Sequence, residues 1–251
     1  MRILPIADHP MLGIEDDSSI LCAGDLHIGI EEELKGKGIH VPSQTFKMEK
    51  ELLTFKGRCD RLVLLGDIKH QVPGSTKQEY AEIPKFLRSM RKAFAEVDIV
   101  RGNHDSNIEY LVPEGINLHP STGLVVDDVG FAHGHTWPSP LVMSRKTVVL
   151  AHNHPSVLFQ EGLGNVTSER CWVRCRMRDN AHKRYNEFPE ELIIVPALNR
   201  ILGGSPVNLK GRKLLGPLFS NDMVDIDDAE LYLIDGIHLG TVRSILVQRS
   251  K

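Results

Sequence analysis

The chain has 251 residues, of which 41% are hydrophobic and 25% charged, with a net charge of −3. This composition is typical of a globular protein with a sizeable core, and we expect one domain over residues 1–251. The net negative charge argues against strong overall electrostatic attraction to nucleic acid. No apolar run approaches the roughly 18 residues of a membrane span. The first eight residues are too short and too quickly charged for a secretory signal, so a cytoplasmic protein is expected.

Short apolar segments and helical patterns alternate along the first half of the chain. We expect two early strands around a turn at Asp16-Asp17, and a helix over residues 43–57. A second helix has apolar residues at the three- and four-residue spacing of a buried stripe. These are Ile83, Leu87, Met90 and Phe94. We place Pro84 in the first turn of this helix, where proline is tolerated.

Alternating residues predict a half-buried strand over residues 171–178. One side would carry Cys171, Val173, Cys175 and Met177, and the other Trp172, Arg174, Arg176 and Arg178. We favour an edge strand charged against edge-to-edge pairing, and contact with a polyanionic substrate is the alternative. Because no second cysteine pair completes Cys171 and Cys175, we favour buried thiols over a zinc or disulfide site.

The last third of the chain reads as strands and turns. A strand is expected over residues 192–196, followed by a turn-rich loop over residues 202–206. Leu231–Ile234 and Ile237–Leu239 flank Asp235-Gly236, which is a strong signal for a hairpin. No repeat or low-complexity linker divides this region from the rest.

Five apolar β-type runs each end in residues that bind metals. In chain order they are Ile20–Gly24 before Asp25-Leu26-His27, Leu62–Leu65 before Gly66-Asp67, Ile99–Val100 before Gly102-Asn103-His104-Asp105, Val129–Ala132 before His133-Gly134-His135, and Val148–Ala151 before His152-Asn153-His154. Catalytic groups in open α/β folds lie just past the carboxyl ends of strands. Oxygen and imidazole ligands suit Mn, Fe, Zn or similar divalent ions. Five such clusters in order predict a catalytic metal centre.

The spacing within each cluster predicts which side chains point together. In an extended chain residues i and i+2 face the same side, so Asp25 and His27 are expected to reach one ion. His152 and His154 are expected to do the same after a slight bend, with Leu26 and Asn153 facing away. Glycines in the clusters allow sharp turns where a side chain would obstruct the ion pocket. They are Gly24, Gly66, Gly102 and Gly134.

The series D-x-H, G-D, G-N-H-D, H-G-H and H-x-H, between residues 20 and 155, resembles the calcineurin-like metallophosphoesterases. The resemblance implies an α/β fold, namely a four-layer α/β/β/α sandwich of two mixed sheets flanked by helices. It implies one metal held by Asp25, His27, Asp67 and His154. It implies a second metal held by Asp67, Asn103, His133 and His152, with Asp67 bridging. The cofactors would be two divalent ions, with Mn favoured and Fe, Zn and Ni as alternatives.

The resemblance also implies a mechanism. A hydroxide activated by the two metals would attack phosphorus in line, while the metals neutralise charge on the phosphoryl oxygens. His104 matches the catalytic histidine and would act as general acid or electrostatic donor, oriented by Asp105. His135 would either line the phosphate pocket or lie on the surface.

Two positions depart from the family pattern. The place three residues after the bridging Asp67 usually holds an acid or asparagine, and here it is His70, which puts the hydrogen bonding behind the ligands in doubt. His70 is a second candidate for substrate binding, beside His135. Ala151 replaces a glycine of the last motif, and we expect no loss of ligation from this smallest change.

Finer features resemble the SbcD-related, ICC-like branch, including the archaeal and ligase-associated types. They are Leu-Gly-Asp-Ile-Lys-His (65–70), Ala-His-Asn-His-Pro (151–155) and Tyr-Leu-Ile-Asp-Gly (232–236). The branch implies a phosphodiesterase with a phosphate-ester substrate, nucleic acid being one candidate. A small-molecule phosphatase or cyclic-nucleotide phosphodiesterase is the alternative, favoured by the acidic charge, and a non-catalytic scaffold is a third. No membrane partner is expected, and a homodimer stays open.

Overall fold

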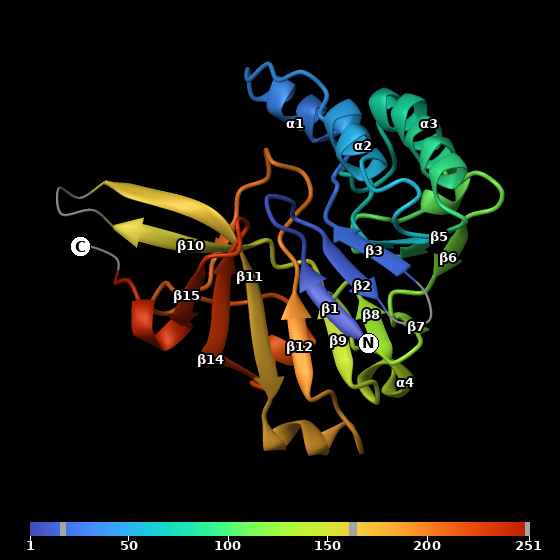
Figure 1. The fold of residues 1–251 in the computed structure, drawn as a ribbon. Coiled ribbons are helices and arrows are strands. Elements are labelled where there is room, and N and C mark those ends of the chain that lie inside the picture. Colours follow the sequence, from blue (N-terminus) through green and yellow to red (C-terminus); the bar gives the residue numbers. More distant parts are fainter. Residues whose placement is uncertain (16–18, 161–164, 249–251) are drawn as a thin grey trace.

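A computed structural model describes residues 1–15, 19–160 and 165–248 (Figure 1). The turn expected at Asp16-Asp17 lies outside the described residues. A six-stranded mixed sheet contains the N-terminal strands in the order β1-β2-β3-β4-β5-β6. Their bounds are Arg2–Pro5, Leu12–Glu15, Ser19–Gly24, Arg61–Leu65, Glu96–Val100 and Asn117–His119. Strands β3 to β6 run parallel, so the residues that follow β3, β4 and β5 meet at one edge of the sheet.

A second, nine-stranded sheet has the path β13-β10-β11-β12-β9-β8-β7, and β14 joins it by pairing with β11 and β15. The strands from β7 to β11 span Leu124–Val126, Val129–Ala132, Thr147–Leu150, Pro155–Gln160 and Val166–Met177. Those from β12 to β15 span Glu191–Ile194, Ser205–Pro206, Val224–Leu233 and His238–Thr241. Strands β8, β9 and β12 are parallel, while β10 and β11 form a hairpin that projects from the body of the molecule.

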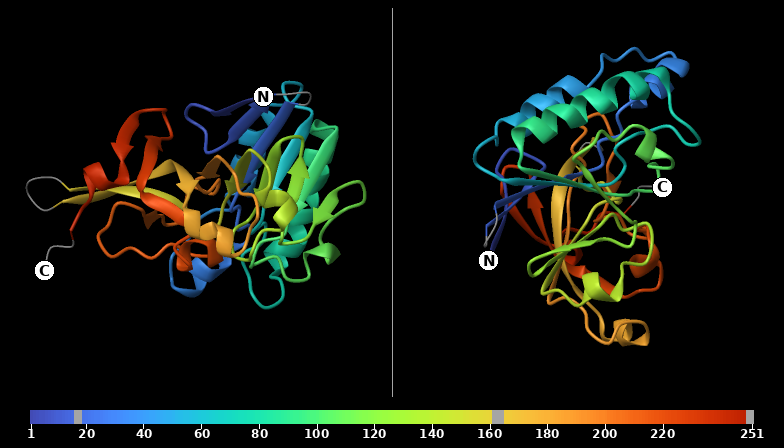
Figure 2. Two further views of the ribbon diagram at one scale, coloured as in Figure 1. Left: turned by 90° about the horizontal axis from the view of Figure 1, so that it is seen from below. Right: turned by 90° about the vertical axis from the view of Figure 1, so that its right-hand side faces the viewer.

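Helices cover the outer face of each sheet, which confirms the expected four-layer α/β/β/α order (Figure 2). Helices α1 (Ile30–Gly36), α2 (Thr45–Leu53) and α3 (Lys77–Ala93) lie over the first sheet. The opposite layer is thinner and contains the short helices α4 (Pro140–Met143) and α5 (Pro217–Ser220). Three 3-10 turns complete the described elements, at Ile108–Tyr110, Asp179–Lys183 and Val242–Ile245.

The apolar core has three parts, one between each pair of adjacent layers. The central part joins the two sheets, and Val63 and Leu65 of β4 lie there with Phe131 of β8 and Trp172 of β11. Fully burying such a side chain contributes about 1.5–3 kcal/mol, so this interface fixes the two sheets against each other. The facing edges of the sheets, and the loops that leave them, are thereby held in place.

Helix α3 begins with a capping box, which is formed by the motif Thr76-x-x-Glu79. The Thr76 hydroxyl accepts a hydrogen bond from the Glu79 amide, and the Glu79 carboxylate accepts one from the Thr76 amide. The helix therefore starts at Lys77, and Pro84 is its eighth residue. Our placement of Pro84 in the first turn was wrong, because the polar residues before Ile83 also belong to the helix. The other expected helix, over residues 43–57, is confirmed with the narrower bounds of α2.

Strand β11 confirms the alternation of residues 171–178 but is not an edge strand. Arg174 is paired with Ile193 of β12 on one side and with Glu230 of β14 on the other. Protection of a free edge was therefore the wrong explanation for the arginines. Arg174 instead forms an ion pair with Glu191 at 2.6 Å, and Arg178 forms one with Asp222 at 2.7 Å.

Side chains from the two faces of β11 lie in different parts of the core. Trp172 is fully buried between the sheets, so it does not accompany the arginines at the surface as expected. Cys171 and Cys175 are free thiols in the core behind the second sheet, and burial raises the pKa of each. The expectation of buried thiols is confirmed.

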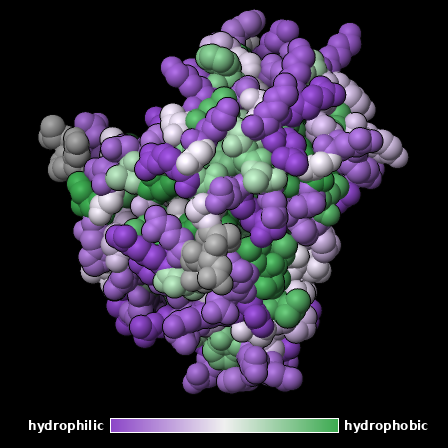
Figure 3. Space-filling view, turned by 45° about the vertical axis from the view of Figure 1, so that its right-hand side comes forward, coloured by the Kyte–Doolittle hydropathy of each residue, from purple (hydrophilic) through white to green (hydrophobic). Residues whose placement is uncertain are grey.

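Two C-terminal predictions are also confirmed. Strand β12 begins at Glu191 and covers most of the strand expected over residues 192–196. Strand β14 turns through Asp235-Gly236 into antiparallel β15. Gly236 has φ 92°, a conformation that glycine adopts without strain. The face in Figure 3 is largely hydrophilic. Among the helices that the structure describes, none combines the length and hydrophobicity that a bilayer crossing requires.

A buried carboxylate links three strands of the first sheet. Asp98 of β5 is 1% exposed and accepts hydrogen bonds from Arg61 Nε (2.9 Å), His119 Nε2 (2.6 Å) and Asn117 Nδ2 (3.1 Å). Burial alone would raise the pKa of Asp98, but the His119 hydrogen bond and the Arg61 charge outweigh it, so the pKa is lowered. The folded state is therefore stabilised above the unfolded pKa of about 4, and this contribution is lost as pH falls through the folded value.

We predict that Asp98→Asn lowers the free energy of unfolding by about 2 kcal/mol at pH 7, because charged donors lose their acceptor. The loss should be smaller at pH 3 than at pH 7, because the wild-type carboxylate gives up its charge as the pH falls through its lowered folded-state pKa. Urea denaturation at both pH values measures it. Glu96→Gln, which removes the exposed partner of Arg61, is the control and should cost under about 1 kcal/mol. An equal loss at both pH values would contradict the prediction.

Candidate metal centre

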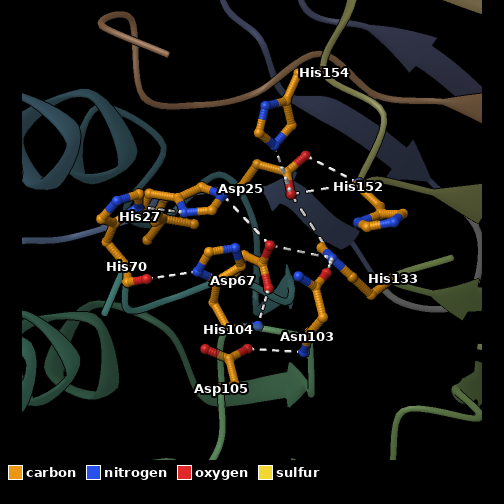
Figure 4. Close-up of polar contacts among 12 residues, drawn as sticks. Asp25, His27, Asp67, His70, Asn103, His104, Asp105, His133, His152 and His154 are labelled. Carbon is orange, nitrogen blue, oxygen red and sulfur yellow. Dashed lines mark hydrogen bonds and ion pairs between the residues drawn. The ribbon is translucent and has the colours of Figure 1, made fainter. Parts of the chain in front are cut away.

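The five polar clusters come directly after β3, β4, β5, β8 and β9, and the structure brings them together (Figure 4). Each expected run is a strand of the structure. The parallel registers β3-β4-β5 and β8-β9 bring their carboxyl ends to the same side of the molecule. The central core holds the two sheets together behind them. Long-range packing thus assembles residues that lie up to about 130 positions apart.

A first group consists of Asp25, His27 and His154, whose ligand atoms lie within 4.8 Å of one another. His154 Nε2 lies 3.3 Å from Asp25 Oδ1. The Asp25 carboxylate also accepts a hydrogen bond from the His152 amide at 3.1 Å, which ties the loop after β9 to the loop after β3. Asp25 and His27 are buried, and the His154 side chain is 20% exposed.

A second group consists of Asp67, His133 and His152, within the same 4.8 Å limit. His133 is fully buried, its Nδ1 donates to the Leu65 carbonyl at 2.8 Å, and its Nε2 points into the centre. The Asn103 side-chain oxygen lies 3.2 Å from that Nε2. Asn103 is exposed, so it lies on the solvent side of this group.

Asp67 lies between the two groups. Its Oδ2 is 3.4 Å from His27 Nε2 and 3.4 Å from His133 Nε2. Its Oδ1 accepts a hydrogen bond from the His104 amide at 2.8 Å. Burial alone would raise the pKa of Asp67, but the hydrogen bond and charge of His133 outweigh it and hold the pKa well below its usual range. Asp67 is therefore an anion at neutral pH.

The backbone of the clusters is left-handed where we had expected it to be extended. Five non-glycine residues of the two groups have positive φ. They are Asp25 (57°), His27 (43°), Asp67 (49°), His152 (71°) and His154 (42°). Such conformations cost roughly 1–2 kcal/mol each and concentrate at functional sites.

This geometry changes the expected pairing of side chains. Asp25 and His27 share a group, as expected, but His152 and His154 belong to different groups, so they do not reach one ion together. Leu26 and Asn153 are buried and face away. Gly102 shows why a side chain is excluded, since a Cβ there would lie 2.2 Å from Asp67 Oδ1. The methyl group of Ala151 lies so close to Gly24 that a Cβ on Gly24 would clash with it.

The residues present fit divalent cations. His27 Nε2 and His154 Nε2 are buried without a hydrogen-bond partner, which is costly unless another group satisfies them. Their 3.3–3.4 Å separations from carboxylate oxygens are close to those of neighbouring ligands on one ion. Burial and neighbouring histidines outweigh the nearby carboxylates and lower the pKa of His27 to about 3, so its lone pairs stay free at neutral pH.

His104 and Asp105 do not form the expected pair. His104 Nδ1 donates to the His70 carbonyl at 2.5 Å, so this carbonyl orients the ring. The buried Asp105 carboxylate accepts from the amides of Gly102 and Ile68, both at 2.8 Å. Burial and the charge of Asp67 raise the pKa of Asp105 to about 6. Asp105 therefore shapes the loops around the centre, and the idea that it orients His104 directly was wrong.

His70 and His135, the two candidates for substrate binding, lie in different places. The His70 ring contacts His27 through Nδ1 and Glu33 through Nε2, so it lies behind a ligand candidate. The His135 ring centroid is 5.2 Å from that of His133, and its Nδ1 is buried without a hydrogen-bond partner. Burial lowers the pKa of His135 to about 4. His135 thus borders the second group.

Several residues that shape the centre were not anticipated from the sequence. Glu33 follows the first motif on α1, and the run Glu31-Glu32-Glu33 after Asp25-x-His27 was the available signal. Glu79, in the capping box, accepts from the His70 amide at 2.8 Å. Apart from this acidic run, nothing in the spacing connects Glu33 or Glu79 to the five polar clusters.

The C-terminal segment supports the loops that carry the candidate ligands. The Asn153 side chain accepts from the Leu215 amide at 2.7 Å and donates to the Leu215 carbonyl at 3.2 Å. A Cβ on Gly216 would lie 2.1 Å from the Gly134 carbonyl oxygen, so only glycine allows this approach. Asn199 donates to the Leu26 carbonyl at 2.8 Å. The chain beyond β12 therefore holds the loops of the first and last motifs.

The arginines of β11 do not take part in the centre. Arg174 and Arg176 line a cavity of about 950 Å³ together with Glu191, Asp225 and Glu230. None of the candidate metal ligands lines this cavity. Carboxylates balance its arginines, so it offers little net attraction for a polyanion. The arrangement supports neither protection of a sheet edge nor contact with a polyanionic substrate as the role of these arginines.

Comparison with known proteins agrees with the fold. No curated protein matches the chain. A solved structure of Pseudomonas putida nuclease MPE is similar, with a TM-score of 0.52, 18% identity, and coverage of 93% of this chain and 96% of that one. YfcE, a phosphoesterase from E. coli, matches with a TM-score of 0.41 and 15% identity over 88% and 96% of the two chains.

The comparison with family models is more specific. The model described as calcineurin-like phosphoesterase matches residues 18–194, which is more than half of the chain and includes all five clusters. The chain therefore belongs to the calcineurin-like phosphoesterase family.

Proposed function

We propose that the protein is a phosphodiesterase that uses two divalent cations, with Mn as the favoured metal. The position of Asp67 carries this proposal. One oxygen of its carboxylate lies 3.4 Å from a histidine of each group, which is where a ligand shared by two ions would lie. The first cation would be held by Asp25, His27, Asp67 and His154. The second would be held by Asp67, Asn103, His133 and His152.

When bound, the two cations would supply the positive charge that activates a water molecule and stabilises the phosphoryl oxygens. The protein's own residues hold this arrangement rigid. Asp25 and Asp67 are buried and anionic, and amides of the neighbouring loops fix both carboxylates. Because the carboxylates cannot rotate without losing these hydrogen bonds, little reorganisation would accompany the reaction.

His104 is the proposed proton donor to the leaving oxygen. Its Nδ1 carries a proton that is bound to the His70 carbonyl, so its Nε2 is available for the substrate. Its amide is held by Asp67, which fixes the ring relative to the metal groups. A histidine whose free nitrogen is protonated would donate as the bond to the leaving oxygen breaks.

The substrate proposed is a phosphodiester, with nucleic acid as the first candidate. The similar P. putida protein is described as a nuclease, and the Leu-Gly-Asp-Ile-Lys-His stretch of residues 65–70 supports the SbcD-related branch. The net charge of −3 favours a second candidate, a small phosphate ester or cyclic nucleotide. The retained ligand set and His104 argue against a scaffold without activity.

A substrate panel tests this function. We expect Mn-stimulated hydrolysis of bis-p-nitrophenyl phosphate to exceed hydrolysis of the monoester at equal concentration. Single-stranded DNA, duplex DNA, RNA and cyclic nucleotides then separate the two candidate substrate classes. A purified protein that binds Mn but hydrolyses none of these esters would contradict the proposal and favour a scaffold.

Removing the shared carboxylate should affect both ions. We predict that Asp67→Ala abolishes Mn-stimulated diester hydrolysis and weakens binding of both cations in calorimetry. His104→Ala should lower kcat by about 10²–10⁴-fold with both ions still bound, since His104 is not among the proposed ligands. His238→Ala, at the exposed first residue of β15, is the control and should behave as wild type. Undiminished hydrolysis by Asp67→Ala would exclude the shared role.

Asn103 contacts only one of the two groups. We predict that Asn103→Ala weakens binding of one cation by about 10-fold or more, and leaves the other within a factor of about three, because only the second group loses an oxygen ligand. Titration calorimetry with Mn²⁺ on metal-free protein measures both affinities. Equal retention of both ions would show that Asn103 is not a ligand.

A further inference from the structure

His70 lies between a carboxylate and a ligand candidate of the first group. Its Nε2 is 2.5 Å from Glu33 Oε2, and its Nδ1 is 3.1 Å from His27 Nδ1 (Figure 4 shows the two rings). The opposite nitrogen of His27, Nε2, points to Asp67 Oδ2 at 3.4 Å. The side chains run from 45% exposed at Glu33, through 14% at His70, to 4% at His27. A continuous polar chain therefore leads from the surface to the metal centre.

The order of protons along this chain follows from its donors and acceptors. A carboxylate only accepts, so His70 Nε2 carries a proton. A neutral His70 then has a lone pair on Nδ1, and the short contact with His27 Nδ1 requires a proton on the His27 side. His27 is thereby left with its lone pair on Nε2, the nitrogen that faces the two buried carboxylates. The reverse order would place a lone pair of His70 against the Glu33 carboxylate.

We propose that Glu33 and His70 are positioning residues that hold His27 in the Nδ1–H tautomer, so that Nε2 is presented to the cation of the first group. This inference rests on the metal centre of the proposed function. A histidine that binds a metal through one nitrogen usually donates its other N–H to an acceptor, and loss of that acceptor weakens metal binding by 10- to 100-fold. Here the acceptor is itself a histidine, whose tautomer a surface carboxylate sets.

The position of His70 makes this role separable from its backbone roles. Its amide donates to Glu79 and its carbonyl accepts from His104, and a side-chain substitution keeps both contacts. Glu33 lies on exposed α1 and also pairs with Lys37. Glu32, the preceding residue, pairs with Lys35 at 3.8 Å and has no contact with His70. Glu32→Gln is thus matched to Glu33→Gln in helix and charge, but does not interrupt the chain.

The tautomer is measured without any metal. Nitrogen-15 chemical shifts of the imidazole rings in metal-free wild type should show His27 protonated on Nδ1 and His70 protonated on Nε2. In Glu33→Gln we expect His27 to become a mixture of tautomers, while Glu32→Gln should match wild type. His27 protonated on Nε2 in wild type, or a doubly protonated His70 at pH 7.5, would overturn the proposal whatever the fate of the proposed function.

Calorimetry with Mn²⁺ tests the consequence for metal binding. We expect His70→Leu, which has no acceptor, to weaken one of the two sites by about 10- to 100-fold. His70→Asn should bind within about threefold of wild type, because its amide oxygen takes the place of Nδ1. Glu33→Gln should weaken the same site by about 3- to 10-fold in the wild-type background, and by less than twofold in the His70→Asn background, where its target is gone.

The outcomes separate the two proposals. If wild type binds two Mn²⁺ ions and His70→Leu binds both with unchanged affinity, the positioning role is wrong and the proposed function stands. If Glu33→Gln weakens binding equally in both backgrounds, the carboxylate acts through general charge and not through His70. If wild type binds no Mn²⁺, the proposed function fails, and the ring shifts of the metal-free protein still decide the tautomer.

Discussion

Two buried carboxylates facing a ring of imidazoles are the constraint on which the rest of the structure depends. Asp25 and Asp67 are nearly inaccessible to water, and histidines are their main charged neighbours. The carboxylates raise the pKa of His133 and His154, whereas burial lowers the pKa of His27 and His152, so only part of the ring takes up protons in the absence of a cation. Burial opposes a charge on His133, yet the hydrogen bond and charge of Asp67 raise its pKa to about 9. The site therefore carries a strong demand for positive charge, which divalent ions would satisfy better than protons.

The sheets supply the rigidity that this demand requires. Left-handed backbone at five candidate ligands would relax in an isolated loop, since each such residue is strained by roughly 1–2 kcal/mol. Each of these residues lies in a loop that directly follows a strand buried in the core. The loop therefore cannot relax without disturbing that strand. Apolar packing between the layers thus offsets the local strain.

The strands, and the meeting of the five polar clusters that follow them, were the parts that sequence alone could predict. Local runs such as Leu62–Leu65 are apolar because they are buried on both faces, and the polar residue that follows marks where burial ends. The surroundings of the ligands depend on contacts between distant residues and were misjudged. Neighbours in sequence, His104 and Asp105, look like partners, but the Asp105 carboxylate accepts hydrogen bonds from the backbone amides of Gly102 and Ile68 instead. The neighbours of β11 likewise follow from tertiary pairing that alternation does not encode, whereas the start of α3 is set by the local capping box of Thr76 and Glu79.

The pair of hydrogen bonds between Asn153 and Leu215 has a consequence for which parts of the chain build the centre. The family model ends at residue 194, yet the segment beyond it abuts the last histidine motif through two hydrogen bonds and a glycine that no larger residue can replace. The candidate ligands thus all lie in the stretch that the family model matches, whereas the loop that carries two of them is also anchored by residues outside that stretch. A fragment cut after residue 194 would keep every candidate ligand but lose this anchor of the loop from His152 to His154.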